Sequence, residues 1–234
     1  MTTFGRPRCH VTQCSSTNDA ARVWALNAES PAPSGALVTA DFQTQGRGQR
    51  GRQWQAEVGQ SALTSFVHRL PPGANASQLG LLAALAVCSA LPGSNSAAKI
   101  KWPNDVLLDG KKVAGILVEV ADGIAIIGIG INVRQTEFPD SDQFVYPPTS
   151  LHLALEEPPS VEEVITEVAA SLGYWEAEGR RDPMAVINAC RGRLAKGARV
   201  RQGEISAMLI GLTDTGAAVV CLPDGTFTEW TTVS

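Results

Sequence analysis

The chain has 234 residues, of which 44% are hydrophobic and 18% are charged, and its formal net charge at pH 7 is −4. This balance is typical of a globular protein and excludes a largely disordered chain, while the acidic net charge argues against an overall nucleic-acid-binding protein. No apolar run is long enough to cross a bilayer, and the N-terminus lacks the apolar core of a signal peptide. The cysteines are scattered and form no CxxC pair, which indicates reduced thiols in a cytoplasmic protein.

The N-terminal part predicts a strand, a helix and a second strand. Residues 8–14 alternate weakly in hydropathy and predict the opening strand. Ser16, followed by Asp19 at the spacing of a capping box, predicts the start of the helix. Residues 36–41 predict the second strand. The apolar face of the helix is expected to carry Ala20, Val23, Trp24 and Ala28.

A loop dense in Gly, Gln and Arg covers residues 42–55 and leads to a further strand at 61–68. Residues 77–91 are apolar nearly all round, which is typical of a buried helix, and Pro92-Gly93 ends it.

The middle of the chain has the clearest strand pattern. Two Asp-Gly pairs, Asp109-Gly110 and Asp122-Gly123, are strong hairpin signals. They separate three β-rich runs, and the pattern therefore predicts a three-stranded antiparallel meander. Its strands are expected at 98–108, 111–121 and 124–133.

The remainder predicts helices followed by a small all-β unit. After a Pro-rich loop at 134–149, Ser160 and Glu163 form a capping box for one helix, and another helix is expected at 183–193. Short strands are then expected at 198–202, 205–212, 217–222 and 226–232. The whole pattern predicts an α+β fold, a mixed and mostly antiparallel sheet with helices plus a small C-terminal β-barrel. We expect a domain boundary between residues 1–193 and 194–234.

The basic loop at 46–52 is the first candidate site. Its three glycines let backbone N–H groups approach a ligand, and its three arginines offer forked donors to phosphate. Because the like charges repel and glycine is flexible, ordering the loop is unfavourable without an anion. We therefore expect a lid that closes over a phosphate-containing ligand. A solvated basic turn or an RNA-binding tract is equally consistent with the loop alone.

Four other segments could carry chemistry, although each also has an ordinary structural interpretation. The motif KWPND at 101–105 presents an amide and a carboxylate side by side, which could help hold Mg²⁺ or orient an amine, or could be a plain turn with a core Trp. Lys112 could reach a carboxylate or phosphate, or sit in a solvated hairpin corner. The glycines of 128–132 indicate close approach by a ligand or by the helix at 77–91. Residues 15–18 could bind a polar group or simply cap the helix.

Taken together, these segments resemble the biotin–protein ligases over nearly the whole chain. The resemblance implies the catalytic fold that biotin and lipoate ligases share with class II aminoacyl-tRNA synthetases, with an SH3-like C-terminal barrel. The motifs that carry it are Ser16-Thr17-Asn18, Gln43-x-x-Gly46-Arg47-Gly48-x-x-Gly51-Arg52-x-Trp54, KWPND at 101–105, Lys112-Val-Ala-Gly-Ile-Leu-Val-Glu119, GIGIN at 128–132 and Thr149-Ser150-Leu151.

The resemblance implies an activity in two steps. Biotin and ATP, with Mg²⁺, would form biotinyl-adenylate, and the biotinyl group would pass to a lysine of the biotin carboxyl carrier protein of acetyl-CoA carboxylase. About fifteen residues precede Ser16, which is too few for the helix-turn-helix domain of some relatives, so we expect a short form that binds no DNA. We also expect no membrane partner, and a monomer or weak homodimer.

The resemblance also assigns roles to individual residues. Asp105 is the candidate Mg²⁺ ligand and the group that orients or deprotonates the attacking amine, and Tyr146 and Phe144 are candidates to stack on adenine. Trp102 would line the pocket. Catalysis is assigned to Lys112, Asp105 and Arg47. Biotin is assigned to Ser16, Thr17, Asn18, Gln43, Arg47, Gly48, Gln49, Lys112, Gly115 and Gly130. ATP and the adenylate are assigned to Arg47, Arg50, Trp54, Asn104, Lys112 and Asn132.

Two departures and two alternatives accompany this interpretation. Gln49 stands where the family often has a lid arginine, and Trp54 is followed by Gln-Ala-Glu where relatives commonly have Ser-Pro. A lipoate–protein ligase shares the chemistry but would bind a tail without a ureido ring. A non-catalytic nucleic-acid-binding module would use the basic loop and the barrel, although few aromatic residues lie near that loop.

Overall fold

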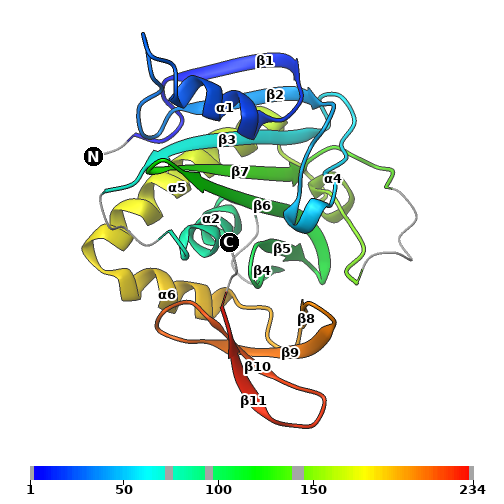
Figure 1. Cartoon of the computed structure of the whole chain (residues 1–234). Coiled ribbons are helices and arrows are strands. Elements are labelled where there is room, and N and C mark those ends of the chain that lie inside the picture. The colour runs from blue at the N-terminus through cyan, green and yellow to red at the C-terminus, as the bar shows by residue number, and fades with distance from the viewer. Residues whose placement is uncertain (1–2, 72–75, 93–96, 139–144, 232–234) are drawn as a thin grey trace.

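The computed structural model describes residues 3–71, 76–92, 97–138 and 145–231, except for the side chain of Arg50. Figure 1 shows a central sheet with helices packed against it and a smaller sheet formed by the C-terminal strands. Within these ranges, no helix combines the length and the apolar character that spanning a bilayer requires.

The central sheet has seven strands in the order β1-β2-β3-β7-β6-β5-β4. β1 runs parallel to β2 and all other neighbours are antiparallel, which confirms the expected mixed, mostly antiparallel sheet. The turns Asp109-Gly110 and Asp122-Gly123 have positive φ at both residues, as a type I′ hairpin requires. The strands are β1 (Arg8–Cys14), β2 (Leu37–Gln43), β3 (Ser61–Arg69), β4 (Ala98–Lys101), β5 (Asp105–Leu108), β6 (Lys111–Ala121) and β7 (Ile124–Asn132).

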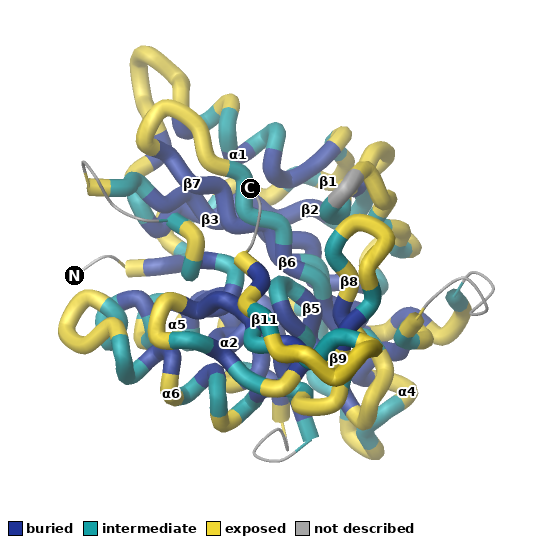
Figure 2. The backbone as a smooth tube through the Cα atoms, turned by 60° about the horizontal axis from the view of Figure 1, so that its bottom comes forward, coloured by how far each residue is buried: buried dark blue, intermediate teal, exposed yellow. Residues whose placement is uncertain are grey.

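Helices cover both faces of the sheet because side chains alternate along each strand. On one face α1 (Thr17–Ala25) packs against β2, β3 and β7, in an apolar cluster that includes Val67 and Ile126. The adjacent residues Phe66 and Ile127 belong to the cluster on the other face. There α2 (Leu79–Ala90) packs on the sheet and is covered by α5 (Val161–Arg181) and α6 (Pro183–Arg193). Nine residues of α2 are buried, which confirms the helix predicted from its all-round apolar sequence. Figure 2 shows β3 and β7 buried between these layers.

The C-terminal helices follow the sequence closely. Ser160 accepts from the backbone N–H of Glu163 and the Glu163 carboxylate accepts from the N–H of Ser160, which confirms the capping box of α5. Asp182 caps α6, which has Pro183 in its first turn. A short helix, α4 (Leu151–Ala154), follows the Pro-rich loop and is capped by Ser150.

The face of α1 that is buried differs from the expected one. Val23 is 72% exposed and Ala28 lies beyond the end of the helix, whereas Ala21 and Ala25 pack on the sheet. Small residues let the helix lie close to the strands, so apolar size was a misleading guide here. Ser16 caps the helix by accepting from the N–H of Asn18, and Asp19 turns away from the cap, so the expected capping box is absent.

The expected strand at 98–108 is divided into β4 and β5 by a turn at 102–104. Pro103 has no N–H to give to a strand ladder. Trp102 is buried, and its indole N–H donates to the Gly216 carbonyl of the C-terminal sheet. The meander therefore has four strands, and its first turn brings Lys101 opposite Asp105.

The C-terminal strands form an open antiparallel sheet in the order β11-β10-β9-β8, and no pairing among the described residues closes it into the expected barrel. Its inner residues, such as Leu209 and Val220, belong to the same apolar cluster as α2. This face is thus covered by the rest of the molecule and does not need to close on itself. The strands are β8 (Arg199–Gln202), β9 (Ile205–Leu212), β10 (Ala218–Cys221) and β11 (Phe227–Trp230).

Candidate active site

Glycines form the floor of the candidate site on the α1 face of the central sheet. Gly128 and Gly130 of β7 are two residues apart, so they face the same side of the sheet at a separation of about 7 Å. Gly128 pairs with Ser65 on one side, and Gly130 pairs with Gly115, which pairs in turn with Asp105. The floor therefore runs across the sheet from β3 to β5.

Side chains lie so close to this floor that only glycine fits. A Cβ atom at Gly128 would lie 2.3 Å from Asn18 Oδ1, and one at Gly130 would lie 2.6 Å from the Trp54 ring. A Cβ at Gly115 would lie 3.0 Å from the same ring. The alternative expected for these glycines, packing against the helix at 77–91, is wrong, because α2 lies on the opposite face.

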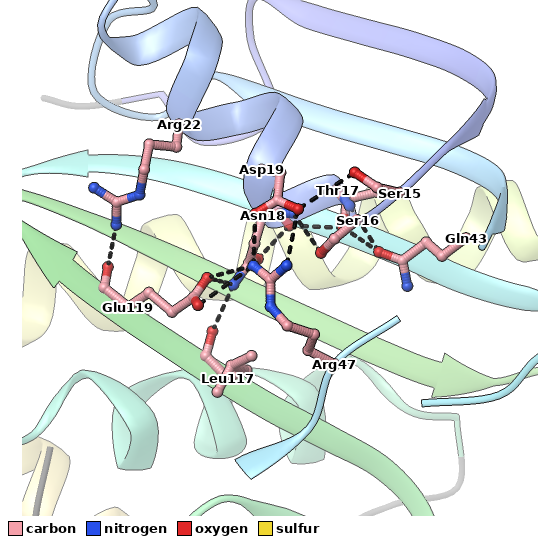
Figure 3. Close-up of polar contacts among 11 residues, drawn as sticks. Ser15, Ser16, Thr17, Asn18, Asp19, Arg22, Gln43, Arg47, Leu117 and Glu119 are labelled. Carbon is pink, nitrogen blue, oxygen red and sulfur yellow. Dashed lines mark hydrogen bonds and ion pairs between the residues drawn. The ribbon is translucent and has the colours of Figure 1, made fainter. Parts of the chain in front are cut away.

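Side chains at the start of α1 take part in a polar network (Figure 3), and Asn18 of this network lies against Gly128 of the floor. The side-chain carbonyl of Gln43 accepts from both the backbone N–H and the hydroxyl of Thr17, at 2.7 and 3.0 Å. The Ser65 hydroxyl is 2.8 Å from the Thr17 hydroxyl and 2.6 Å from Asn18 Oδ1. These contacts fix several donors and acceptors at the start of α1, where the helix offers its free N–H groups.

Asn18 connects this network to β6. Its Nδ2 donates to the Glu119 carboxylate at 2.7 Å and to the Leu117 carbonyl at 3.4 Å. Asn18 is 3% exposed, so a partner lost here would leave a buried amide unpaired, at a cost of about 1–3 kcal/mol. Its orientation is therefore firmly set before any ligand arrives.

Arg47 of the loop is held by two carboxylates (Figure 3). It donates to both oxygens of Asp19, at 2.8 and 2.6 Å, and to Glu119 at 3.3 Å. Hydrogen bonds from Arg47 hold the pKa of Asp19 below its usual value, although partial burial opposes this. Arg22 lies nearby and donates to the backbone carbonyl of Glu119. The guanidinium of Arg47 is thus engaged within the protein.

The loop folds back on itself above the floor. Its tip is a 3₁₀ turn, η1 (Gln49–Gly51), and the N–H of Gly48 donates to the Arg52 carbonyl at 2.7 Å. The Trp54 ring returns to cover Gly115 and Gly130, and its indole nitrogen is buried without a hydrogen-bond partner among the described residues. The two ends of the loop line a cavity of about 180 Å³, formed by Phe42, Gln43, Thr44, Gln45, Gly46, Gln53, Trp54, Gln55 and Ala56.

Two lysines and one aspartate lie at the other end of the floor. Asp105 Oδ1 is 2.6 Å from Lys112 Nζ, and Asp105 Oδ2 is 3.0 Å from Lys101 Nζ. The Asp105 side chain is 12% exposed and that of Lys101 17%, whereas Lys112 is 30% exposed and therefore the more open to a ligand. Lys112 Nζ also lies 5.8 Å from the centre of the Trp54 ring.

The charge state of Asp105 follows from these contacts. Burial alone would raise the pKa of its carboxyl, but the charges of Lys112 and Lys101 and their hydrogen bonds outweigh burial and hold the pKa below its usual value. Both oxygens face ammonium groups, which repel a dication. Among the described residues no three His, Cys, Asp or Glu side chains gather as metal ligands. These residues therefore do not fit a Mg²⁺ ion held at Asp105.

The asparagines of KWPND (101–105) and GIGIN (128–132) support the backbone. Asn104 Nδ2 donates to the Ile116 carbonyl at 2.7 Å, and Asn132 Nδ2 donates to the Thr149 carbonyl at 2.9 Å. Trp102 is buried in the main core. The amide groups of both asparagines thus hold neighbouring segments in place, at the edge of the lysine cluster.

Two comparisons decide the family. The family model described as "Biotin/lipoate A/B protein ligase family" matches residues 11–135. A biotin–[acetyl-CoA-carboxylase] ligase of Paracoccus denitrificans is 35% identical over 225 residues, which cover 88% of this chain and 94% of that protein. The chain belongs to the biotin/lipoate A/B protein ligase family.

Other members of the ligase family agree in sequence and in fold. A bifunctional ligase/repressor of Bacillus subtilis is 44% identical over 122 residues, which cover 48% of this chain and 38% of that protein. The solved biotin protein ligase of Aquifex aeolicus, in complex with biotin and ATP, superimposes with a TM-score of 0.81 at 27% identity. That match covers 97% of this chain and 96% of the solved one.

In the structure of this chain, most of the residues predicted for the site lie in two groups. Ser16, Thr17, Asn18 and Gln43 lie together at one end of the floor, and Trp54, Gly115, Gly130, Lys112 and Asp105 lie at the other. Gly48 and Gln49 lie at the tip of the loop. The side chain of Arg50 and all of Phe144 lie outside the described residues. The roles assigned to these residues stay predictions.

Sequence reasoning gave no part in the site to four residues that the structure brings into it. Ser65, Asp19 and Lys101 complete the networks, and Glu119 ends a motif without having been assigned a contact. Ser65 could have been found from the sequence, because it is a polar residue in a mostly apolar strand. The spacing of Lys101 and Asp105 had none, because a turn and not a helix brings them together.

Proposed function

We propose that the chain is an ATP-dependent biotin–protein ligase. It forms biotinyl-adenylate from biotin and ATP and transfers the biotinyl group to a lysine of the biotin carboxyl carrier protein of acetyl-CoA carboxylase. The observation that carries the proposal is the glycine floor, which joins a buried polar network at Asn18 to an ammonium group at Lys112. A ligand with a polar ring, an apolar chain and a terminal carboxylate matches such a site.

The polar network favours biotin over lipoate. The ureido ring of biotin carries two N–H donors and one carbonyl acceptor, whereas the dithiolane of lipoate carries none. Thr17, Asn18 and Gln43 are held in a buried hydrogen-bonded arrangement, and each unsatisfied partner would cost about 1–3 kcal/mol. A site of this kind rejects a ring that offers no hydrogen bonds.

The opposite end of the floor suits adenylation. One carboxylate oxygen of biotin attacks the α-phosphorus of ATP, the bond to the bridging oxygen breaks, and pyrophosphate leaves. The Lys112 ammonium, fixed by Asp105, would lie against the carboxylate and the α-phosphate, where negative charge is concentrated. The reaction needs positioning and charge stabilisation, without a covalent enzyme intermediate.

Transfer consumes the mixed anhydride. The acceptor lysine, as a free amine, attacks the acyl carbon, the acyl–phosphate bond breaks, AMP leaves, and the amine loses a proton. Because water competes with the amine, the loop at 46–52 and the Trp54 ring would protect the anhydride by covering it, which requires the ring to shift from its contact with Gly115 and Gly130. Relatives named for acetyl-CoA carboxylase support that protein as the source of the acceptor.

Exchange of labelled pyrophosphate into ATP tests the proposal. We expect exchange that depends on biotin and not on lipoate, and its loss in Lys112→Ala while circular dichroism and the melting temperature are retained. Labelled biotin should then pass to the purified carrier domain but not to a carrier whose acceptor lysine is replaced. Exchange supported by lipoate alone would identify a lipoate ligase, and undiminished exchange in Lys112→Ala would remove that residue from catalysis. RNA binding without any exchange would favour the nucleic-acid-binding alternative.

A further inference from the structure

The carboxylate of Asp105 is shared between two ammonium groups, and this sharing carries the inference. Each oxygen takes a different lysine, Lys112 at 2.6 Å and Lys101 at 3.0 Å. One lysine alone would neutralise the carboxylate. The second leaves one positive charge in excess, and among the described residues no other carboxylate lies within ion-pair distance of either lysine.

The excess charge is held in place and partly withdrawn from solvent. The Lys101 side chain is 17% exposed, and its Nζ lies 5.7 Å from the centre of the Tyr146 ring, whose face attracts a cation. The Tyr146 hydroxyl accepts from the backbone N–H of Arg199 at 2.6 Å, which fixes the ring against the C-terminal sheet. Two like charges held near each other are unfavourable without an anion, so the arrangement favours binding of one.

The two lysines are also braced by one segment. The backbone N–H of Lys112 donates to the Pro147 carbonyl at 2.9 Å, and the N–H of Thr149 donates back to the Lys112 carbonyl at 2.9 Å. Tyr146 of the same segment covers Lys101. One segment thus holds the backbone of Lys112 and places an aromatic ring beside Lys101, so it contacts both lysines of the cluster.

We propose that Lys101 is a second cation for the phosphates of ATP, and that Asp105 is the ionised bridge that positions Lys101 and Lys112 and does not serve as a general base. This rests on the proposed ligase function. Lys112, the more open of the two, serves the reacting carboxylate and α-phosphate, and Lys101 adds the charge that attracts the rest of the triphosphate. A carboxylate that is stabilised in its ionised form by two ammonium groups is a poor acceptor for a proton from an attacking amine.

Kinetics of pyrophosphate exchange in Lys101→Met test the phosphate role. Loss of one charge-assisted contact should raise KM for ATP about tenfold. KM for biotin should stay within about twofold, because the polar network at Asn18 is untouched. Lys101→Arg, which keeps the charge, should recover most of the loss. Lys111→Met is the matched control, since it removes the same charge from the neighbouring, exposed hairpin corner.

The second half-reaction separates a charge role from a merely structural one. Transfer from preformed biotinyl-adenylate involves no triphosphate, so Lys101→Met should leave its rate within about twofold of wild type. Equal KM values for ATP in Lys101→Met and Lys111→Met would overturn the proposal. Equal losses in both half-reactions would also overturn it. If Lys101→Met fails to fold, Lys101→Gln replaces it. Equal KM values for ATP in Lys101→Gln and Lys101→Arg would then overturn the proposal.

Asp105→Asn tests the bridge. The bridge role predicts that this change impairs exchange at least as strongly as transfer, because an amide bonds one lysine but turns its NH₂ toward the other. A general-base role predicts wild-type exchange with transfer lost, and that result would refute the bridge. The proposed function is tested separately, since absence of biotin-dependent exchange in the wild-type protein would refute the ligase itself. ATP titrations of wild type and Lys101→Met by calorimetry would then still report on the phosphate site.

Discussion

Two charged clusters lie at opposite ends of the glycine floor, and they differ in how their charge is balanced. At one end Arg47 and Arg22 meet Asp19 and Glu119, so positive and negative groups are equal in number. At the other end Lys101 and Lys112 share Asp105, so one positive charge is in excess. A balanced cluster suits a neutral ring, and an unbalanced one suits an anion.

This difference moves the expected phosphate contact away from Arg47 of the loop. The arginines of 46–52 predict phosphate binding from composition alone, but the Arg47 guanidinium is already bonded to two carboxylates. Its contact with Glu119, which also holds Asn18, makes it a support for the polar network. The lysines of β4 and β6, which are ordinary strand residues in the sequence, share one carboxylate and therefore carry an excess positive charge.

The largest expected effect is on the Kd for biotin, from a substitution at the Asn18 end of the glycine floor, where the charges are balanced. Gly128→Ala would place a Cβ atom 2.3 Å from Asn18 Oδ1 and force that side chain away from Ser65. We expect the Kd for biotin to rise about 100-fold, because a buried contact this short cannot relax without breaking hydrogen bonds. Calorimetry measures it, and the Kd for ATP in the absence of biotin should change little.

A glycine replaced elsewhere provides the control for that variant. Gly192 of α6 has nothing within 4 Å of the added Cβ, so Gly192→Ala should bind biotin as wild type does. If Gly128→Ala also kept wild-type affinity for biotin, Asn18 and the polar network would not be the ring-binding site. If it weakened ATP binding equally, the two ends of the floor would not be separable.

Arg47→Met tests whether the balance of charges around Asp19 and Glu119 matters for binding. Without its guanidinium, Asp19 and Glu119 repel each other and Glu119 is free to leave Asn18. We expect the Kd for biotin to rise about tenfold and KM for ATP in exchange to change less than about twofold. Arg201→Met, an exposed change on β8, controls for loss of charge. A larger rise in KM for ATP than in the Kd for biotin would mean that Arg47 contacts the phosphates of ATP, as the family resemblance implies.

The sequence predicted the fold where local chemistry and packing agree. The Asp-Gly turns, the capping box at Ser160 and Glu163 and the all-apolar helix at 77–91 each needed only neighbouring residues to be recognised, and each is confirmed. The division at Trp102 was missed because a tertiary contact, the indole bond to Gly216, decides where that side chain goes. The prediction of a closed barrel was wrong for a similar reason, since the rest of the protein covers one face of the C-terminal sheet.

The site was predictable as a set of residues but not as a set of contacts. Motif spacing singled out Asn18, Gly130 and Lys112, which share one face of the sheet. It could not reveal that Arg47 is bonded to Asp19, because the pair is 28 residues apart and joins a loop to a helix. Nor could it reveal Lys101, since the register of β4 and β5 sets that contact. Charge balance depends on such distant pairs, so composition alone misplaces it.

The smallest expected effect is a difference in acid sensitivity between the two clusters. The pKa values of Asp105 and Asp19 are both lowered in the folded protein, so each carboxylate contributes stability that is present above its unfolded pKa of about 4. That contribution is lost as the pH falls through the folded pKa. The Asp105 side chain is 12% exposed and bonds two ammonium groups, whereas that of Asp19 is 45% exposed. Asp105 should therefore contribute the larger share.

Urea unfolding between pH 6 and pH 3 measures that share. Between pH 5 and pH 3 the free energy of unfolding should fall less steeply in Asp105→Asn than in wild type, by about 1 kcal/mol, and Asp19→Asn should show a smaller reduction. The slope is compared because Asp105→Asn already leaves one lysine unpaired at pH 6. Glu204→Gln, at an exposed turn without an ion pair among the described residues, should follow wild type. Parallel curves for wild type and Asp105→Asn would mean that the pKa of Asp105 is not lowered in the folded protein, so the two lysines would not stabilise its ionised form.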